Sequence, residues 1–430
     1  MSILKNIAEL VRENVISQET ADKIKNYYNT SEKQTTNKLF VVFGVLGATL
    51  VGLGLILIIA HNWDDLSRVT KTIFAFIPLL IGQIMSGYSL IKKPKSAAWI
   101  ESSAAFLFFA IGLSIALVGQ IYNIPGSFNT FMVAWMLLSI PLVYILKSQV
   151  VSVFYIVGIT YYAVDLNYLT FSRFNKSNSI IYWLLLVLIL PNYYLLYKNK
   201  PKSNFMVLHN WLLPISIIIT LATLMKDHAI LIFVAYFSLY GLFYLIGSSD
   251  FFKHQKLRNN SYKILGSLGT VILLIAFSFN GFWKELQKEN LIFSEVLKSP
   301  EFLVTTLITL LGIVLLYFQV KNKSIKEIKP IAPTFLLFIL IFIIGLKFAI
   351  AVILINILVF SVGLLTIKEG AKQNHLGILN YGLLIITAMI VSRFFDTKLS
   401  FVFRGILFIL VGVGFFITNY WMLKKRKVNE

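Results

Sequence analysis

The sequence predicts an all-α, polytopic integral membrane protein with about fourteen transmembrane helices and a short cytosolic helical hairpin at its amino terminus. Three observations lead to this fold class. Hydrophobic residues make up 57% of the 430 residues and charged residues only 13%, whereas soluble domains hold about 25% charged residues. The hydrophobic residues fall in runs of about twenty, the length that crosses ~30 Å of hydrocarbon as a helix. Lysine-rich turns lie at alternate ends of these runs, as expected of cytoplasmic loops.

Residues 1–38 precede the first apolar run and are predicted to form the cytosolic hairpin. Ile7 and Leu10 recur at helical spacing in its first helix. Asn14 can turn the chain, and Ser17 can cap a second helix. The segment is too short to bury much core alone. We expect it to be either a structural cap on the inner face of the membrane or a docking element for a protein partner.

The predicted spans follow in order from residue 39. Residues 39–150 hold about the first four and form one membrane domain, while residues 151–430 hold about ten more and end in a basic tail. Around Lys347 the pattern allows one tilted span or two across residues 331–367. A single span there would invert every later loop. The segments are 39–60, 73–91, 97–120, 130–146, 149–166, 180–197, 205–225, 229–247, 264–282, 302–320, 331–346, 348–367, 376–394 and 401–422.

Basic residues are distributed as a membrane topology requires. With the amino terminus inside, the lysine-rich segments all fall on the cytoplasmic side, so both termini are predicted to be cytoplasmic. The net charge of +20 is dispersed over many short segments. This pattern favours anionic lipid headgroups as partners and argues against nucleic acid. The lysine-rich segments on the cytoplasmic side are 92–95, 198–202, 253–263, 321–329 and 424–427.

Two further features of the composition limit the chemistry and the targeting. The chain has no cysteine, which excludes disulfides, thiolate catalysis and cysteine-ligated metals. The first 38 residues are polar, and the first apolar run is too long for the core of a cleavable signal peptide. We therefore expect the first span to act as an uncleaved signal anchor.

Ionisable side chains inside hydrocarbon are costly and are therefore candidates for function. Within the predicted spans they are Glu101, Asp165, His209, Lys347 and Arg404. An isolated histidine such as His209 is typical of a satisfied core residue.

Glu101 shares one face of its helix with four small residues, all within about 60° of it around the helix axis. The first span carries a matching stripe of small residues, which would let the two backbones approach closely. Glu101 is therefore either a buried proton or cation site, or a carboxylate that hydrogen-bonds neighbouring helices. The small residues are Ala105, Gly112, Ala116 and Gly119 in the third span and Gly44, Ala48 and Gly52 in the first.

A polar cluster is predicted at the outer membrane boundary. Arginine can make bidentate contacts there, and tryptophan or tyrosine can stack on a headgroup, a glycan or a small solute. The alternative is that Trp63 is an interfacial anchor, Asp64 or Asp65 caps a helix, and Arg404 reaches out of the membrane. The candidate binding residues are His61, Asn62, Trp63, Asp64, Gln120, Tyr122, Arg393, Asp396 and Arg404, with Glu101 coupling from the inner side.

Several catalytic and metal-binding motifs do not occur in the sequence. It has no glycine-rich phosphate loop with lysine, no H-E-x-x-H, no G-x-S-x-G and no histidine pair at metal-ligand spacing. ATP-driven transport and zinc proteolysis are thus disfavoured, and neither a cofactor nor a metal is expected. Polar groups predicted near the bilayer midplane are neutral, among them Gln83, Ser114 and Asn356. This weakens the case for ion-coupled transport without excluding it.

Five segments give the sequence a family resemblance. It resembles a family of bacterial polytopic membrane proteins catalogued as a domain of unknown function, mainly over residues 1–150 and in the last span. The resemblance implies a location in the bacterial inner membrane and adds weight to the polar residues of these segments as one set; it implies no activity. The segments are "VISQETADKI" (15–24), "AHNWDD" (60–65), "AWIESSA" (98–104), "GLSIALVGQIYN" (112–123) and, more loosely, "RFFDTKLSFVFRG" (393–405).

Three functions remain open from the sequence. The first is a transporter-like or solute- or headgroup-binding protein with a polar site at the outer ends of the first, third and last spans. The second is a non-catalytic scaffold or sensor that binds a partner through residues 1–38. The third is an intramembrane enzyme acting on lipid-linked substrates, with Asp64 or Asp65 as base.

Overall fold

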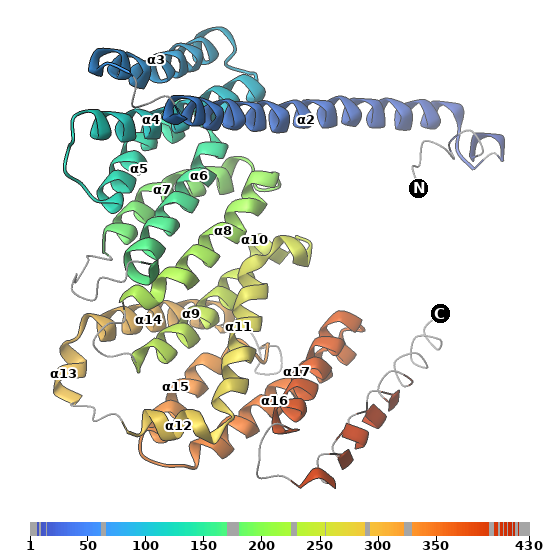
Figure 1. Ribbon diagram of the computed structural model, residues 1–430. Coiled ribbons are helices and arrows are strands. Elements are labelled where there is room, and N and C mark those ends of the chain that lie inside the picture. Colours follow the sequence, from blue (N-terminus) through green and yellow to red (C-terminus); the bar gives the residue numbers. More distant parts are fainter. Residues whose placement is uncertain are drawn as a thin grey trace. The chain divides into compact units, whose positions relative to one another are not determined.

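The computed structural model describes most of the chain as helices and short turns, without a strand in the described residues (Figure 1). In residues 25–40, 55–56, 58–61, 169, 253, 293 and 394 only the backbone is described. The described residues are 7, 10–13, 15–61, 66–169, 180–224, 230–253, 255–288, 293–321, 329–394, 400–402, 405–406, 408–410, 412–414, 416–417 and 420.

The helices divide into two compact units, Met1–Met206 and Val207–Glu430. The sequence predicts a boundary at residue 150 instead. The division lies later because α5, α6 and α7 pack against one another, so that packing continues past residue 150. The first unit holds α2 (Gln18–His61), α3 (Arg68–Lys92), α4 (Ala97–Ile121), α5 (Phe128–Ile145), α6 (Gln149–Val164), a π-helix (Asp165–Leu169) and α7 (Ile180–Asn199).

The helix α2 replaces two predicted elements, the second helix of the hairpin and the first span. It runs unbroken for 44 residues, about 66 Å at 1.5 Å per residue. The predicted boundary at residue 38 does not interrupt it, because residues 29–40 contain neither glycine nor proline. Residues 1–38 are therefore not separated from the first span by a loop.

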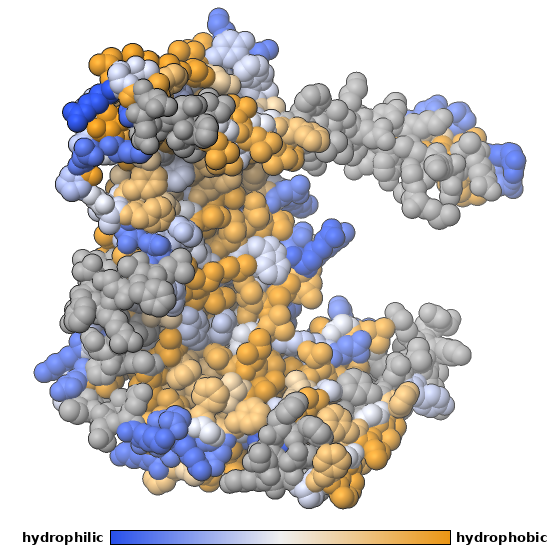
Figure 2. Space-filling view, in the orientation of Figure 1, coloured by the Kyte–Doolittle hydropathy of each residue, from blue (hydrophilic) through white to orange (hydrophobic). Residues whose placement is uncertain are grey.

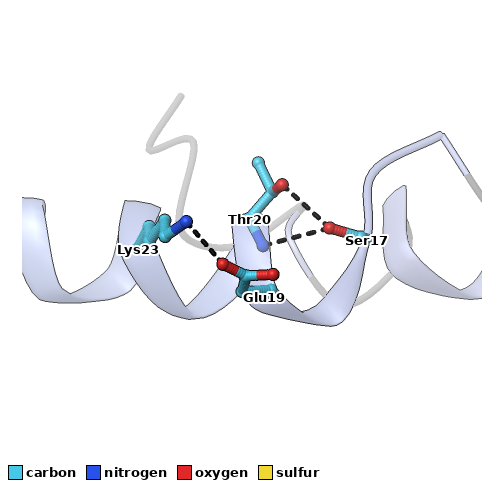
Figure 3. A network of polar contacts seen from close by, with 4 residues as sticks. All are labelled: Ser17, Glu19, Thr20 and Lys23. Atoms are coloured by element: carbon cyan, nitrogen blue, oxygen red, sulfur yellow. Dashed lines mark hydrogen bonds and ion pairs between the residues drawn. The ribbon is translucent and has the colours of Figure 1, made fainter.

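The start of α2 confirms the predicted cap at Ser17 (Figure 3). The backbone N–H of Thr20 donates to Ser17 Oγ at 3.2 Å, and the two hydroxyl oxygens lie 2.9 Å apart. One turn on, Lys23 pairs with Glu19 at 2.5 Å. The bond from Thr20 satisfies one of the backbone donors that the first turn of a helix leaves without an intrahelical partner.

Small residues hold α3 and α4 together. Gly82 lies so close to α4 that a Cβ there would stand 3.1 Å from Leu107 Cα. Ser114 Oγ donates to the carbonyl oxygen of Ala75 at 2.6 Å, and the hydroxyls of Ser89 and Ser103 lie 3.0 Å apart. Close backbone approach and hydroxyl bonds of this kind are how helices associate in lipid.

In its described residues the second unit holds nearly all of α8, which spans the division, and eleven more helices of varied length, two of them 3-10. Its core is aromatic, with Phe237, Phe277, Trp283, Phe335 and Phe338 almost fully buried. The helices are α8 (Asn204–Leu221), a 3-10 turn (Ala222–Leu224), α9 (Leu231–Gly247), α10 (Asp250–Lys253), a 3-10 turn (Leu257–Asn259), α11 (Ser261–Phe277), α12 (Asn280–Leu286), α13 (Phe293–Lys298), α14 (Pro300–Val320), α15 (Thr334–Gly345), α16 (Ala351–Lys372) and α17 (Leu376–Phe394).

The protein is a polytopic helical membrane protein, but the predicted count of fourteen spans is higher than the structure supports. Among the described residues nine helices are long and apolar enough to cross a membrane, or ten if α11 and α12 form one span bent by 81°. Three predicted spans fall short because their apolar helical stretches are too brief. These are Val41–Gly54 within α2, Leu231–Gly247 and Thr334–Gly345.

The segment 331–367 forms two helices. Trp283 lies against Gly345 at the end of α15, and Asn356, near the start of α16, donates to the carbonyl oxygen of Ser278 at 3.2 Å. Both contacts are with the corner between α11 and α12, so the chain turns back around Lys347. The helix α15 has 12 residues, about 18 Å, and alone does not cross ~30 Å of hydrocarbon.

Many large apolar side chains remain exposed on the helices, as the lipid-facing surface of a membrane protein requires (Figure 2). Within the most apolar stretch of each helix, only 11% of α14 is buried inside the protein, whereas 61% of α4 is buried. The helix α4 is therefore the central element of the first unit, and it supplies more residues to the lining of the candidate site than any other helix.

Candidate functional site

A groove of about 1080 Å³ opens in the first unit between α3, α4 and α5. Its walls are mainly apolar, with Phe76 from α3, Ile115 from α4 and Phe131 from α5. The turn that joins α4 to α5, which includes Pro125, closes one end. Because Gly119 and this turn line it, the groove lies toward the end of α4 at which Gln120 and Tyr122 emerge.

Four polar side chains line this groove, and three of them are bonded within the protein. Ser114 donates to Ala75 on α3. Ser127 and Thr130 form a reciprocal cap at the start of α5. The fourth, Gln83, forms no hydrogen bond with any described residue, and it is exposed on the groove wall. An amide without a partner is costly in hydrocarbon, so Gln83 is the side chain on this wall that a polar group of a ligand could bond.

Glu101 lies at the opposite end of α4 and does not line the groove. It is 6% exposed. Its carboxylate accepts hydrogen bonds from Ser148 Oγ at 2.5 Å and from the backbone N–H groups of Gln149 and Val150, each at 3.1 Å. Glu101 thus caps the amino terminus of α6, where helical N–H groups lack partners and negative charge is favoured. Of the two alternatives, this geometry is that of a carboxylate bonding a neighbouring helix.

The small-residue prediction for this face was partly wrong. The helix α2 does pack on α4, but Gly44 lies against Ser102, and a Cβ on Gly52 would stand 3.4 Å from Phe109. The Glu101 face instead packs on α5 and α6, and a Cβ on Gly112 would meet the Trp135 ring at 2.5 Å. The spacing of the small residues correctly predicted an interface between helices, but it does not show which helix packs there.

A buried polar network beside Glu101 was not predicted. The side-chain amides of Gln149 and Asn192 bond each other at 3.2 and 3.3 Å, and Asn192 also donates to Ser152 Oγ at 3.0 Å. Asn192 is 4% exposed. An asparagine within an apolar run was the available signal, since buried amides in lipid bond between helices.

The predicted outer cluster is only partly described. Asn62, Trp63, Asp64, Asp65, Asp396 and Arg404 lie outside the described residues. The backbone of His61 ends α2, which runs parallel to α4, so this helix end lies toward the same end of the first unit as Gln120. Gln120 is exposed. The hydroxyl oxygen of Tyr122 lies 3.2 Å from that of Thr72 on α3.

Arg393 belongs to the second unit and is described there by itself. It donates to Ser278 Oγ at 2.6 Å, and its guanidinium carbon lies 4.5 Å from the centre of the Phe279 ring. Both partners sit at the break between α11 and α12. A cation at the carboxyl terminus of α11 interacts favourably with the helix dipole, so Arg393 stabilises the bend.

The remaining ionisable candidates are dispersed. Asp165 begins the π-helix, His209 is fully buried within α8, and Lys347 lies in the turn between α15 and α16. Among the described residues no group of three or more histidine, aspartate or glutamate side chains could hold a metal ion.

The comparisons with known proteins give one match. Neither the curated proteins nor the solved structures contain a significant match to this chain. The match is to a protein family, and it covers α2 to α5, the groove, and Glu101 with its three donors. Over residues 8–152 the chain matches the family described as "Predicted membrane protein (DUF2157)", in agreement with the resemblance read from its motifs.

Proposed function

We propose that this protein is a lipid-binding, transporter-like membrane protein, and that its first unit holds one acyl chain in the groove between α3, α4 and α5. The observation that carries the proposal is Gln83. Its amide stands on an apolar wall of a cavity of about 1080 Å³ and has no hydrogen-bond partner among the described residues. A ligand with an apolar chain and one uncharged acceptor or donor satisfies both features.

The groove favours a lipid over a water-soluble molecule. Phe76, Ile124 and Leu138 line it and are 43%, 57% and 57% exposed, so it opens sideways, toward the hydrocarbon. A neutral amide suits an ester carbonyl or a hydroxyl rather than a charged group.

Filling the groove is expected to remove lipid binding. The full chain is placed in nanodiscs with a trace of phosphatidylcholine that carries a diazirine in one acyl chain, and photolabelled peptides are mapped by mass spectrometry. Ala134 lines the groove, so Ala134→Phe should reduce labelling of the groove about tenfold through steric exclusion. Gln83→Leu should reduce it about threefold, the value of one hydrogen bond.

Two controls separate this result from general lipid contact. Leu137 is 47% exposed on the same helix without lining the groove, so Leu137→Phe should leave labelling unchanged. Gln83→Leu with Ile84→Gln moves the amide by one residue and should not restore it. Equal labelling of all lipid-facing helices, unaltered by Ala134→Phe, would contradict the proposal.

We propose in addition that the chain lies in a bacterial inner membrane with both termini cytoplasmic, so that it crosses the membrane an even number of times. The lysine-rich turns and the reversal at Lys347 support this topology. Because the chain has no cysteine, a maleimide can react only with a cysteine introduced by substitution. In right-side-out vesicles an impermeant maleimide should modify Lys347→Cys, whereas Lys198→Cys and Lys424→Cys should react only after inversion. Reaction of the last two from opposite sides would refute the scheme.

A further inference from the structure

At the inner end of the second unit, as the proposed topology places it, two pairs of helices come into close backbone contact, α9 with α11 and α16 with α17. A Cβ on Gly266 of α11 would stand 2.9 Å from Tyr244 Cα on α9. A Cβ on Gly370 of α16 would stand 2.6 Å from Leu379 Cα on α17. Contacts this close make the end of the unit rigid, so the side chains that project there hold fixed positions.

Two lysines and one carboxylate lie at this end, close enough for their charges to interact. Lys263, in the first turn of α11, is half-buried, and it is repelled by the charge of Lys329 and attracted by that of Glu369. Glu369 already accepts a hydrogen bond from Gln373 Nε2 at 3.0 Å. Among the described residues neither lysine comes within 4.0 Å of a carboxylate oxygen. The group therefore holds a surplus of positive charge in a partly desolvated place.

A hydroxyl pair lies one helical turn along α11 from Lys263, on the same face of the helix. Ser267 Oγ donates to the hydroxyl oxygen of Tyr381 at 2.8 Å, so the Tyr381 hydroxyl keeps its own hydrogen to donate. Tyr244, 5% exposed, lies near both Glu369 and Tyr381. Two ammonium groups, a free hydroxyl hydrogen and the amino-terminal end of α11 all favour an anion with several acceptor oxygens.

We propose that Lys263 and Lys329, with the hydroxyl of Tyr381, bind a phosphate group at this end of the second unit. The phosphate would offset the repulsion between the two lysines, and its several oxygens could accept from all three groups at once. This site is independent of the groove in the first unit. The phosphate belongs either to an anionic lipid of the inner leaflet, the usual ligand of basic pockets between spans, or to a soluble phosphate ester.

Lipid competition on the full chain tests the site. The protein is placed in nanodiscs of phosphatidylcholine with increasing phosphatidylglycerol, and bound lipids are counted by native mass spectrometry. One phosphatidylglycerol should be retained by the unaltered chain. Lys263→Gln and Lys329→Gln should each weaken its retention about tenfold, the value of one charged hydrogen bond, and Lys263→Arg should preserve it.

The controls remove the same charge elsewhere. Lys256 and Lys321 are exposed, and their replacement by glutamine should change retention less than about twofold. Displacement of the lipid by millimolar glycerol phosphate would assign the site to a soluble ester, which keeps the phosphate proposal and corrects its source. Equal retention by the unaltered chain and the variant with both lysines replaced would overturn the proposal. If that variant does not fold, equal loss in Lys263→Arg and Lys263→Gln would overturn it instead.

Discussion

Replacing Glu101 by leucine is expected to lower the free energy of unfolding by roughly 3–5 kcal/mol, because each buried donor left without an acceptor costs ~1–3 kcal/mol. The carboxylate accepts from Ser148 and from two backbone N–H groups at the start of α6, and leucine offers none of them a partner. Glu101→Gln keeps one acceptor oxygen and should cost about half as much. Thermal unfolding of the purified protein in detergent measures both changes.

The same experiment separates the two roles that the sequence left open for Glu101. Glu285→Leu is the control, since Glu285 has a side chain that is 73% exposed, and it should change stability by less than about 0.5 kcal/mol. Ser148→Ala should cost about 1 kcal/mol, because it removes one donor to Glu101 and the cap of Val151. If Glu101→Leu were as stable as the control, the carboxylate would have to be explained as a proton or cation site instead.

Replacing Gly266 by valine is expected to separate α9 from α11 and to cost about 3 kcal/mol or more. A Cβ at this position would stand 2.6 Å from Tyr240 O and 2.9 Å from Tyr244 Cα. Both are backbone atoms, which cannot turn aside as the end of a side chain can. The aromatic core of the second unit depends on this pair of helices, so we expect loss of the monodisperse species in size-exclusion chromatography as well as a lower unfolding temperature.

Gly281 provides the matched control for this substitution. It is exposed on α12, and a Cβ there would meet nothing within 4 Å. Gly281→Val should therefore be neutral within about 0.5 kcal/mol. Equal behaviour of the two valine variants would show that α9 and α11 do not pack at the distance described.

The hydrophobic runs were enough to predict a polytopic helical protein, and most predicted spans correspond to a helix within a few residues. Predictions that depend only on neighbouring residues were also confirmed, such as the helix cap at Ser17. The number of spans could not be predicted in the same way, because the length of an apolar run does not show where the helix within it ends. The 12-residue helix α15 stops at the turn around Lys347, and α11 bends by 81° into α12.

The sequence did not predict which residues on different helices pack against or hydrogen-bond one another. The helical spacing of Glu101 with small residues correctly indicates an interface, but only the fold shows that α6 supplies the donors. Gln83 and Asn192 are both neutral polar residues in apolar runs. Asn192 is bonded to Gln149 and Ser152, whereas Gln83 faces the groove. No local pattern separates these two outcomes.

The amino-acid sequence was sufficient to predict that this chain is helical and lies in a bilayer, and which ends of its helices carry positive charge. These properties follow from transfer free energies summed over neighbouring residues. Three features became visible only in the folded chain: α2 is one helix, Glu101 caps α6, and α3, α4 and α5 form a groove with Gln83 on its wall. The reason is physical. Whether a polar group is satisfied depends on atoms brought close in space from distant parts of the chain, and periodicity records only which face a residue occupies, not what the face meets.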